Sequence, residues 1–166
     1  MPRTLGPWEV VGVTTSPRQS RYLLAACAAL AVVVAVVVAV GVIPEVRVAD
    51  VPNVSPETAV PAFWVSVGLH LLAALVLGLT ATLSKGRSRI STSILVVTGI
   101  ALLFLGFALS DAALAFREAG PSMRAVTTLL WLCVAADVLA GTLTIATAVL
   151  RPARAEQERI QHRFRS

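Results

Sequence analysis

The chain is divided into four long apolar stretches by short segments that carry nearly all of its charged residues. The stretches contain 22 to 26 residues and no Lys or Arg; they are residues 22–43, 62–83, 91–116 and 125–150. At about 1.5 Å per residue, a helix of this length crosses a hydrocarbon core of about 30 Å. Their hydrophobicity is continuous rather than alternating, which favours helices over the strands of a membrane barrel. The pattern predicts an all-α integral membrane four-helix bundle.

Prolines and glycines predict where these helices begin and end. We expect Pro44 to end the first span, Pro61 to lie in the first turn of the second, and Pro152 to end the fourth. The Gly-Pro-Ser sequence at 120–122 predicts a turn before the fourth span. Residues 44–61 then form a loop of about 18 residues between the first two spans.

The distribution of basic residues predicts the orientation. Of the 14 Lys and Arg residues, 11 lie in the two tails, 1–21 and 151–166, and in the connector between the second and third spans. Because Lys and Arg near helix ends stay on the cytoplasmic side, we expect a multi-pass protein of the cell membrane with both termini in the cytoplasm. The 44–61 loop is expected on the outer side.

Composition and net charge narrow the classes of partner. Hydrophobic residues make up 57% of the chain and charged residues 14%, against about 25% charged in soluble domains, which excludes an ordinary soluble domain. The net charge of +5 is explained by the orientation, so no nucleic acid partner is expected. The use of Arg, Ala and Val favours a bacterial origin.

The C-terminal tail is expected to contact the anionic inner leaflet through its basic residues. A solvated tail and a docking segment for a cytoplasmic partner are the alternatives. The residues concerned are Arg151, Arg154, Arg159, Arg163 and Arg165.

Small residues recur at helical spacing in every span. Helices in lipid associate closely where Gly and Ala allow their backbones to approach, so these positions are candidates for helix packing. They serve either the bundle itself or a contact with another subunit. The candidates are Ala31, Ala35, Ala39, Gly78, Gly99, Gly106 and Gly141.

Three ionisable residues fall inside the predicted spans: His70, Asp111 and Asp137. Measured from the predicted outer helix ends, they lie roughly 12, 8 and 18 Å deep. Charged groups at such depth are costly and usually have a partner, so these three are the candidate functional residues. Three interpretations remain open: a proton or cation relay, structural polar bonding, and contact with a partner subunit. In the structural interpretation Asp111 either reaches the membrane interface or pairs with an outer arginine, Arg117 or Arg124. Asp137 then bonds a hydroxyl, that of Thr142 or Ser66.

No catalytic, metal or cofactor motif is complete, and we expect no enzyme activity and no cofactor. His70 is the only histidine inside a span, which excludes a haem held by two histidines of this chain. Cys27 and Cys133 differ in expected depth by about 10 Å, too far for a disulfide. The function expected is that of a non-catalytic accessory or scaffold subunit of a larger membrane complex, which is respiratory, transport or cell-envelope. The partners expected are other membrane subunits or further copies of the same chain. The alternative is a small oligomeric proton- or cation-coupled transporter or channel that uses the three ionisable residues.

Overall fold

The computed structural model describes residues 17–48, 54–83 and 89–163, which are almost entirely helical. The first helical stretch consists of α1 (Pro17–Val36), the π-helix η1 (Val37–Val42) and α2 (Ile43–Val48). It is followed by α3 (Pro56–Leu83) and α4 (Arg89–Glu118). A short 3-10 helix, η2 (Pro121–Met123), leads into α5 (Arg124–Arg163).

Four of the described helical stretches are long and apolar enough to cross a membrane. They are Arg18–Val48, Pro56–Leu83, Ser91–Glu118 and Pro121–Val149. Each contains one of the four stretches predicted from the sequence, except for the last residue of the fourth, Leu150. The prediction of four long apolar helices is therefore confirmed.

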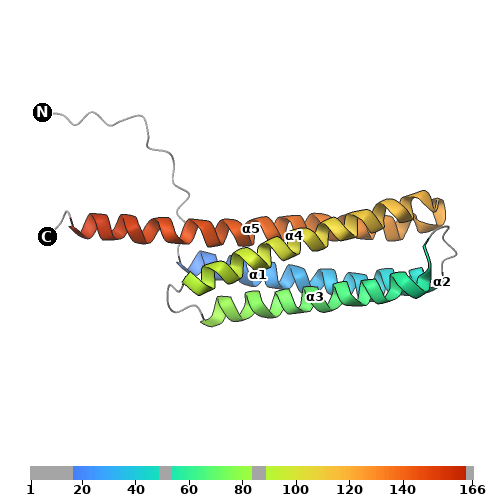
Figure 1. The fold of residues 1–166 in the computed structure, drawn as a ribbon, viewed down its shortest axis with the longest axis horizontal. Helices are drawn as coiled ribbons and strands as arrows, with labels where there is room; N and C mark the ends of the chain where they lie inside the picture. Colours follow the sequence, from blue (N-terminus) through green and yellow to red (C-terminus); the bar gives the residue numbers. More distant parts are fainter. Residues whose placement is uncertain (1–16, 49–53, 84–88, 164–166) are drawn as a thin grey trace, which may run out of the picture.

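The helices form two pairs that pack side by side (Figure 1). Helix α1 packs along α3, and α4 packs along α5. The two pairs are joined mainly by α1 against α5, while α3 has fewer contacts with α4. Helix α5 continues past the other helices at the end of the bundle opposite α2 (Figure 1).

The apolar core consists of two clusters stacked along the bundle. One cluster, near α2 and η2, includes Phe63 and Phe116, whose rings stack with centroids 6.3 Å apart. The other, toward the opposite end, includes Leu24, Leu77 and Leu95. Side chains that reach the core from all four long helices thus hold the two pairs together.

The expectation that Pro44 ends the first span is wrong, because the helix continues through it to Val48. A proline keeps a helical φ, but it lacks an amide hydrogen and its ring clashes with the carbonyl four residues earlier. The wider turn of η1, in which backbone bonds reach five residues, ends two residues before this proline. We attribute the passage of the helix through Pro44 to this widened turn. Residues 44–48, which were expected to belong to the 44–61 loop, are therefore helical.

The predicted start of the second span is also wrong, because α3 begins at Pro56 and Pro61 lies inside it. The carbonyl of Ser55 accepts bonds from the backbone amides of Thr58 at 3.1 Å and Ala59 at 3.0 Å. Pro56, with its fixed φ, suits the first helical position. Pro61 leaves the carbonyl of Glu57 without its helical partner, and this exposed first turn tolerates the loss.

The fourth helix does not end at Pro152, since α5 continues to Arg163. The fixed φ of proline is compatible with a helix, and the neighbouring backbone bonds maintain it across one missing bond. The predicted turn at 120–122 is confirmed. Gly120 there has a φ of 94°, which glycine adopts without strain, and its carbonyl accepts the amide of Met123 at 3.3 Å.

Candidate functional site

Two of the three predicted ionisable residues meet in the interior of the bundle. His70 of α3 has 0% of its surface exposed, and Asp137 of α5 has 1%. The Nε2 atom of His70 lies 3.0 Å from each carboxylate oxygen of Asp137. Because α3 belongs to one helix pair and α5 to the other, this contact connects the two pairs across the bundle.

The contacts of the other ring nitrogen of His70 show which ring nitrogen carries a hydrogen. Its Nδ1 atom is 2.7 Å from the backbone carbonyl of Ser66, one turn earlier, and 3.4 Å from the hydroxyl of the same residue. A carbonyl oxygen only accepts, so Nδ1 carries a hydrogen and donates it. Nε2 then either donates to an ionised Asp137 or accepts from a protonated one. In both cases one proton is shared between ring and carboxyl, and the pair has no net charge.

The two residues lie at the same level of the bundle. His70 follows the first residue of α3 by 14 residues, and Asp137 follows the first residue of α5 by 13. At about 1.5 Å per residue, each is about 20 Å from the start of its helix. The graded depths of 12 and 18 Å were wrong because α3 begins six residues before the predicted span. The pair also separates the two apolar clusters of the core, which contain Val67 and Cys133 on one side and Ala73 and Ala140 on the other.

Glycines bring α4 directly against the helix that carries Asp137. A Cβ atom added at Gly106 would lie 3.1 Å from the Cβ of Asp137. Farther along, a Cβ at Gly99 would lie 2.9 Å from the carbonyl oxygen of Gly141, and one at Gly141 would lie 2.8 Å from that of Gly99. These three glycines let the backbones of α4 and α5 approach more closely than any larger residue permits.

The remaining small-residue candidates lie in different surroundings. Ala31 and Ala35 are buried in the bundle, and Ala39 is half-buried against its core. A Cβ at Gly78 would meet nothing within 4 Å, so this glycine is not at a close helix contact with the part of the chain that the structure describes.

Asp111 is separated from the other two ionisable residues. It is exposed on α4, seven residues before the end of that helix and therefore about 10 Å from it. The expected pairing with Arg117 or Arg124 is not formed, because His70–Asp137 is the one ion pair among the described side chains. The two arginines are exposed themselves, so their charges do not depend on Asp111 for a partner inside the bundle.

The expected bond of Asp137 to a hydroxyl is replaced by its bond to His70. Thr142 is exposed, and Ser66 acts on the histidine instead, through its carbonyl. This role of Ser66 was not predicted, although its position four residues before His70 is a usable signal, since residues four apart are neighbours on one helix face.

The other predicted residues add no further site. Cys27 and Cys133 are free and buried in different core clusters. No group of His, Cys, Asp and Glu suited to a metal ion occurs in the described ranges. Of the basic tail, Arg165 and the side chains of Arg151, Arg154, Arg159 and Arg163 lie outside what the structure describes.

Comparison with known proteins gives no functional information. The chain matches no protein-family model, no curated protein and no solved structure.

Proposed function

We propose that this protein is a non-catalytic accessory or scaffold subunit of a larger complex in the cell membrane, respiratory, transport or cell-envelope. The observation that carries the proposal is the exposure of Asp111 on the apolar flank of α4. Insertion scales assign about 2.5 to 3.5 kcal/mol to a charged residue at the centre of a span and less toward its ends, and such residues normally face a protein partner or water. Asp111 lies about 10 Å inside the end of α4, where a smaller part of this cost applies. A neighbouring subunit that covers Asp111 provides that partner.

The geometry of the buried pair also favours a structural role. The shared proton between His70 and Asp137 satisfies both groups, and the remaining ring N–H ends on the carbonyl of Ser66. A relay needs a group beyond the histidine that accepts and releases protons. The carbonyl of Ser66, 2.7 Å from Nδ1, does not do so, and the hydroxyl of the same residue is the more distant neighbour at 3.4 Å. The transport alternative therefore has less support than a polar clamp between the two helix pairs.

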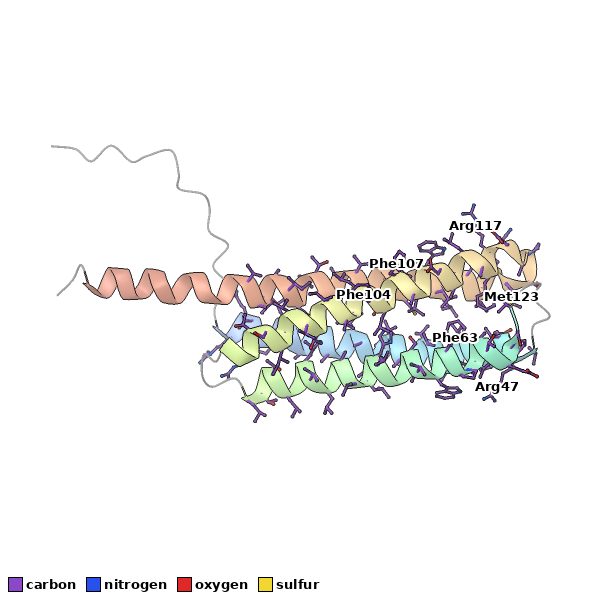
Figure 2. The ribbon with its side chains drawn as sticks, viewed as in Figure 1. Arg47, Phe63, Phe104, Phe107, Arg117 and Met123 are labelled. Atoms are coloured by element: carbon purple, nitrogen blue, oxygen red, sulfur yellow. The ribbon has the colours of Figure 1, made fainter. Side chains whose placement is uncertain are left out.

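The proposed orientation places both termini in the cytoplasm, following the distribution of basic residues. Arg47 and Arg117 both lie toward the end of the bundle that this orientation places outside, on opposite sides of the bundle in Figure 2. The extension of α5 lies at the opposite end, on the side assigned to the cytoplasm (Figure 1).

The test is purification of the tagged chain from its own cells in mild detergent, followed by mass spectrometry and an absorption spectrum of the same sample. We expect a fixed set of stoichiometric membrane partners. The set should be lost or reduced with Asp111→Asn and retained with Glu118→Gln, a control that removes an exposed carboxylate at the end of the same helix. A colourless homo-oligomer that conducts protons or cations in proteoliposomes, and loses this flux with Asp137→Asn, would overturn the proposal.

A further inference from the structure

A groove lies between α4 and α5 on the outer surface of this helix pair. It has a volume of about 500 Å³. All of its lining residues are exposed or half-buried, so the groove is open to the surroundings of the bundle. They are Leu103, Thr142, Ile145, Ala146 and Val149. Apart from the hydroxyl of Thr142 the lining side chains are apolar, so the groove suits a hydrocarbon chain.

The groove is formed by the closest contact of α4 with α5. A Cβ added at Gly141 would lie 2.9 Å from the Cγ of Leu103, and one at Gly99 would lie 2.6 Å from the Cγ1 of Ile145. Each of these two large lining side chains therefore rests on a glycine of the opposite helix. The hollow is a result of this packing, and not of the spacing of exposed residues along one helix.

The position of the groove matches the depth of one leaflet. The candidate membrane span that contains it ends at Val149, and Thr142 lies seven residues, or about 10 Å, before that end. Half of a hydrocarbon core is about 15 Å. The groove thus runs from the end of the span most of the way to the middle of the bilayer, which is the depth that acyl chains of one leaflet occupy.

Basic residues cluster in the sequence at the end of the bundle where the groove opens. This is the end at which α5 continues past the other helices (Figure 1). Residues 84–89, up to the start of α4, contain three basic residues and no acidic one, and residues 150–155 of α5 contain two and none. Positive charge next to a membrane surface attracts anionic lipid headgroups.

The same charge disfavours a second copy of the chain in the groove. Copies inserted in one membrane share their orientation, because the distribution of basic residues determines it. Two copies in contact here would place their basic segments 84–89 and 150–155 side by side, and like charges brought together in an interface repel. An anionic lipid complements both the apolar groove and the positive charge at its mouth.

We propose that the groove binds one acyl chain of an anionic phospholipid from the leaflet at the end where α5 extends, with the phosphate held by the basic residues of segments 84–89 and 150–155. This inference goes beyond the proposed accessory role and does not depend on it. The groove provides the contact with the chain, and the basic segments select the headgroup.

The test is native mass spectrometry of the full chain purified in detergent. The chain is titrated with phosphatidylglycerol or phosphatidylcholine of identical acyl chains. Each basic residue near the surface favours an anionic headgroup about fivefold, so we expect one phosphatidylglycerol to bind roughly five- to twenty-fivefold more tightly. Ala146→Phe, which fills the groove, should abolish this binding. Ala135→Phe, at an exposed position of α5 outside the groove, should keep it.

Two further variants separate the groove from the headgroup contact and from misfolding. Thr142→Phe narrows the groove from an exposed position, so it is expected to fold even where Ala146→Phe does not. Arg151→Gln combined with Arg154→Gln should reduce the preference for phosphatidylglycerol while a weaker binding of both lipids remains. Thermal unfolding in detergent verifies that each variant is folded.

Three outcomes would overturn the inference. Equal binding of the two lipids would show that the headgroup is not selected. A preference that survives both Thr142→Phe and Ala146→Phe would place the lipid outside the groove. A dimer of the chain that is lost in these two variants, and kept in Ala135→Phe, would show that a second copy occupies the groove.

Discussion

Asp137 and Asp111 are both carboxylates within apolar helices, and their surroundings differ in every respect. Asp137 is buried, lies 3.0 Å from the ring of His70, and has the close backbone of Gly106 behind it. Asp111 lies on the exposed surface of α4, near the exposed residues Phe107 and Leu114. It has no hydrogen bond or ion pair to any described side chain.

The difference suggests two separate uses of the same side chain. Asp137, with its neutralising partner, holds helices of one chain together. In the accessory role proposed above, we expect Asp137 to contribute to the stability of the isolated protein and Asp111 to contribute to assembly. Experiments on stability and on assembly should therefore separate the two residues.

The largest expected effect comes from breaking the buried pair. His70→Leu or Asp137→Leu leaves one polar group without its partner in the core, and we expect each to lower the free energy of unfolding by about 3 kcal/mol. Unfolding in mixed detergent micelles, followed by circular dichroism, measures this loss.

The control is the double variant with Leu at both positions. Since no unpaired group remains, it should be much more stable than the sum of the single losses predicts. Additive losses would contradict the assignment of a shared proton between the two groups.

The next effect concerns the closest approach of α4 to α5. Gly99→Ala places a Cβ 2.6 Å from the Cγ1 of Ile145 and 2.9 Å from a backbone oxygen, and backbone atoms cannot move aside cheaply. We expect a loss of about 2 kcal/mol, the cost typical of overpacking. Gly68→Ala is the matched control, because its Cβ would meet nothing within 4 Å. An equal loss in both variants would mean that helix propensity or lipid contact, rather than packing, determines the result.

A smaller loss is expected at Gly106, which lies behind Asp137. A Cβ there stands 3.1 Å from the Cβ of Asp137, so the aspartate shifts by a few tenths of an ångström relative to His70. We expect Gly106→Ala to cost about 1 kcal/mol. The cost should fall when Asp137 is also replaced by Gly, which removes the Cβ that the new methyl group meets, and a double-mutant cycle measures this coupling. Independence of the two changes would place the strain elsewhere along α4.

The smallest effect on the isolated protein is expected at Asp111. Asp111→Leu removes no hydrogen bond or ion pair to a described side chain and adds apolar surface that lipid accommodates, so the unfolding midpoint in detergent should not fall. Co-purification of partners should decline strongly in the same variant. A clear loss of stability would show that Asp111 serves the bundle itself and would remove the contrast with Asp137.

The apolar pattern predicted the helices well, because membrane spanning requires long apolar runs and few other solutions exist. Helix ends were predicted less well. Pro44, Pro61 and Pro152 were each interpreted as a boundary or first-turn residue, whereas each lies within a helix. A proline removes one hydrogen bond, and its consequence depends on the neighbouring turns, which the sequence alone does not specify.

The candidate site was predicted in its residues but not in its pairing. The error in the start of α3 placed His70 and Asp137 at different depths, although they lie side by side. The sequence did not indicate that Asp111 lies on the surface of the bundle rather than in its interior, because α4 has small residues on two of its faces. Gly99 and Gly106 face α5, while Ala101 and Ala108 are exposed.

The π-helix η1 has a consequence for how the length of the chain can vary. Bonds that reach five residues rather than four accommodate one additional residue in a turn. Deletion of one valine between Val37 and Val40 would restore ordinary α-helical bonding while both flanking segments keep their faces toward the core. The shortened turn would then bring a carbonyl against the ring of Pro44, so we expect the deletion to be tolerated best together with Pro44→Ala. Related chains that differ in length here should therefore differ at position 44 as well.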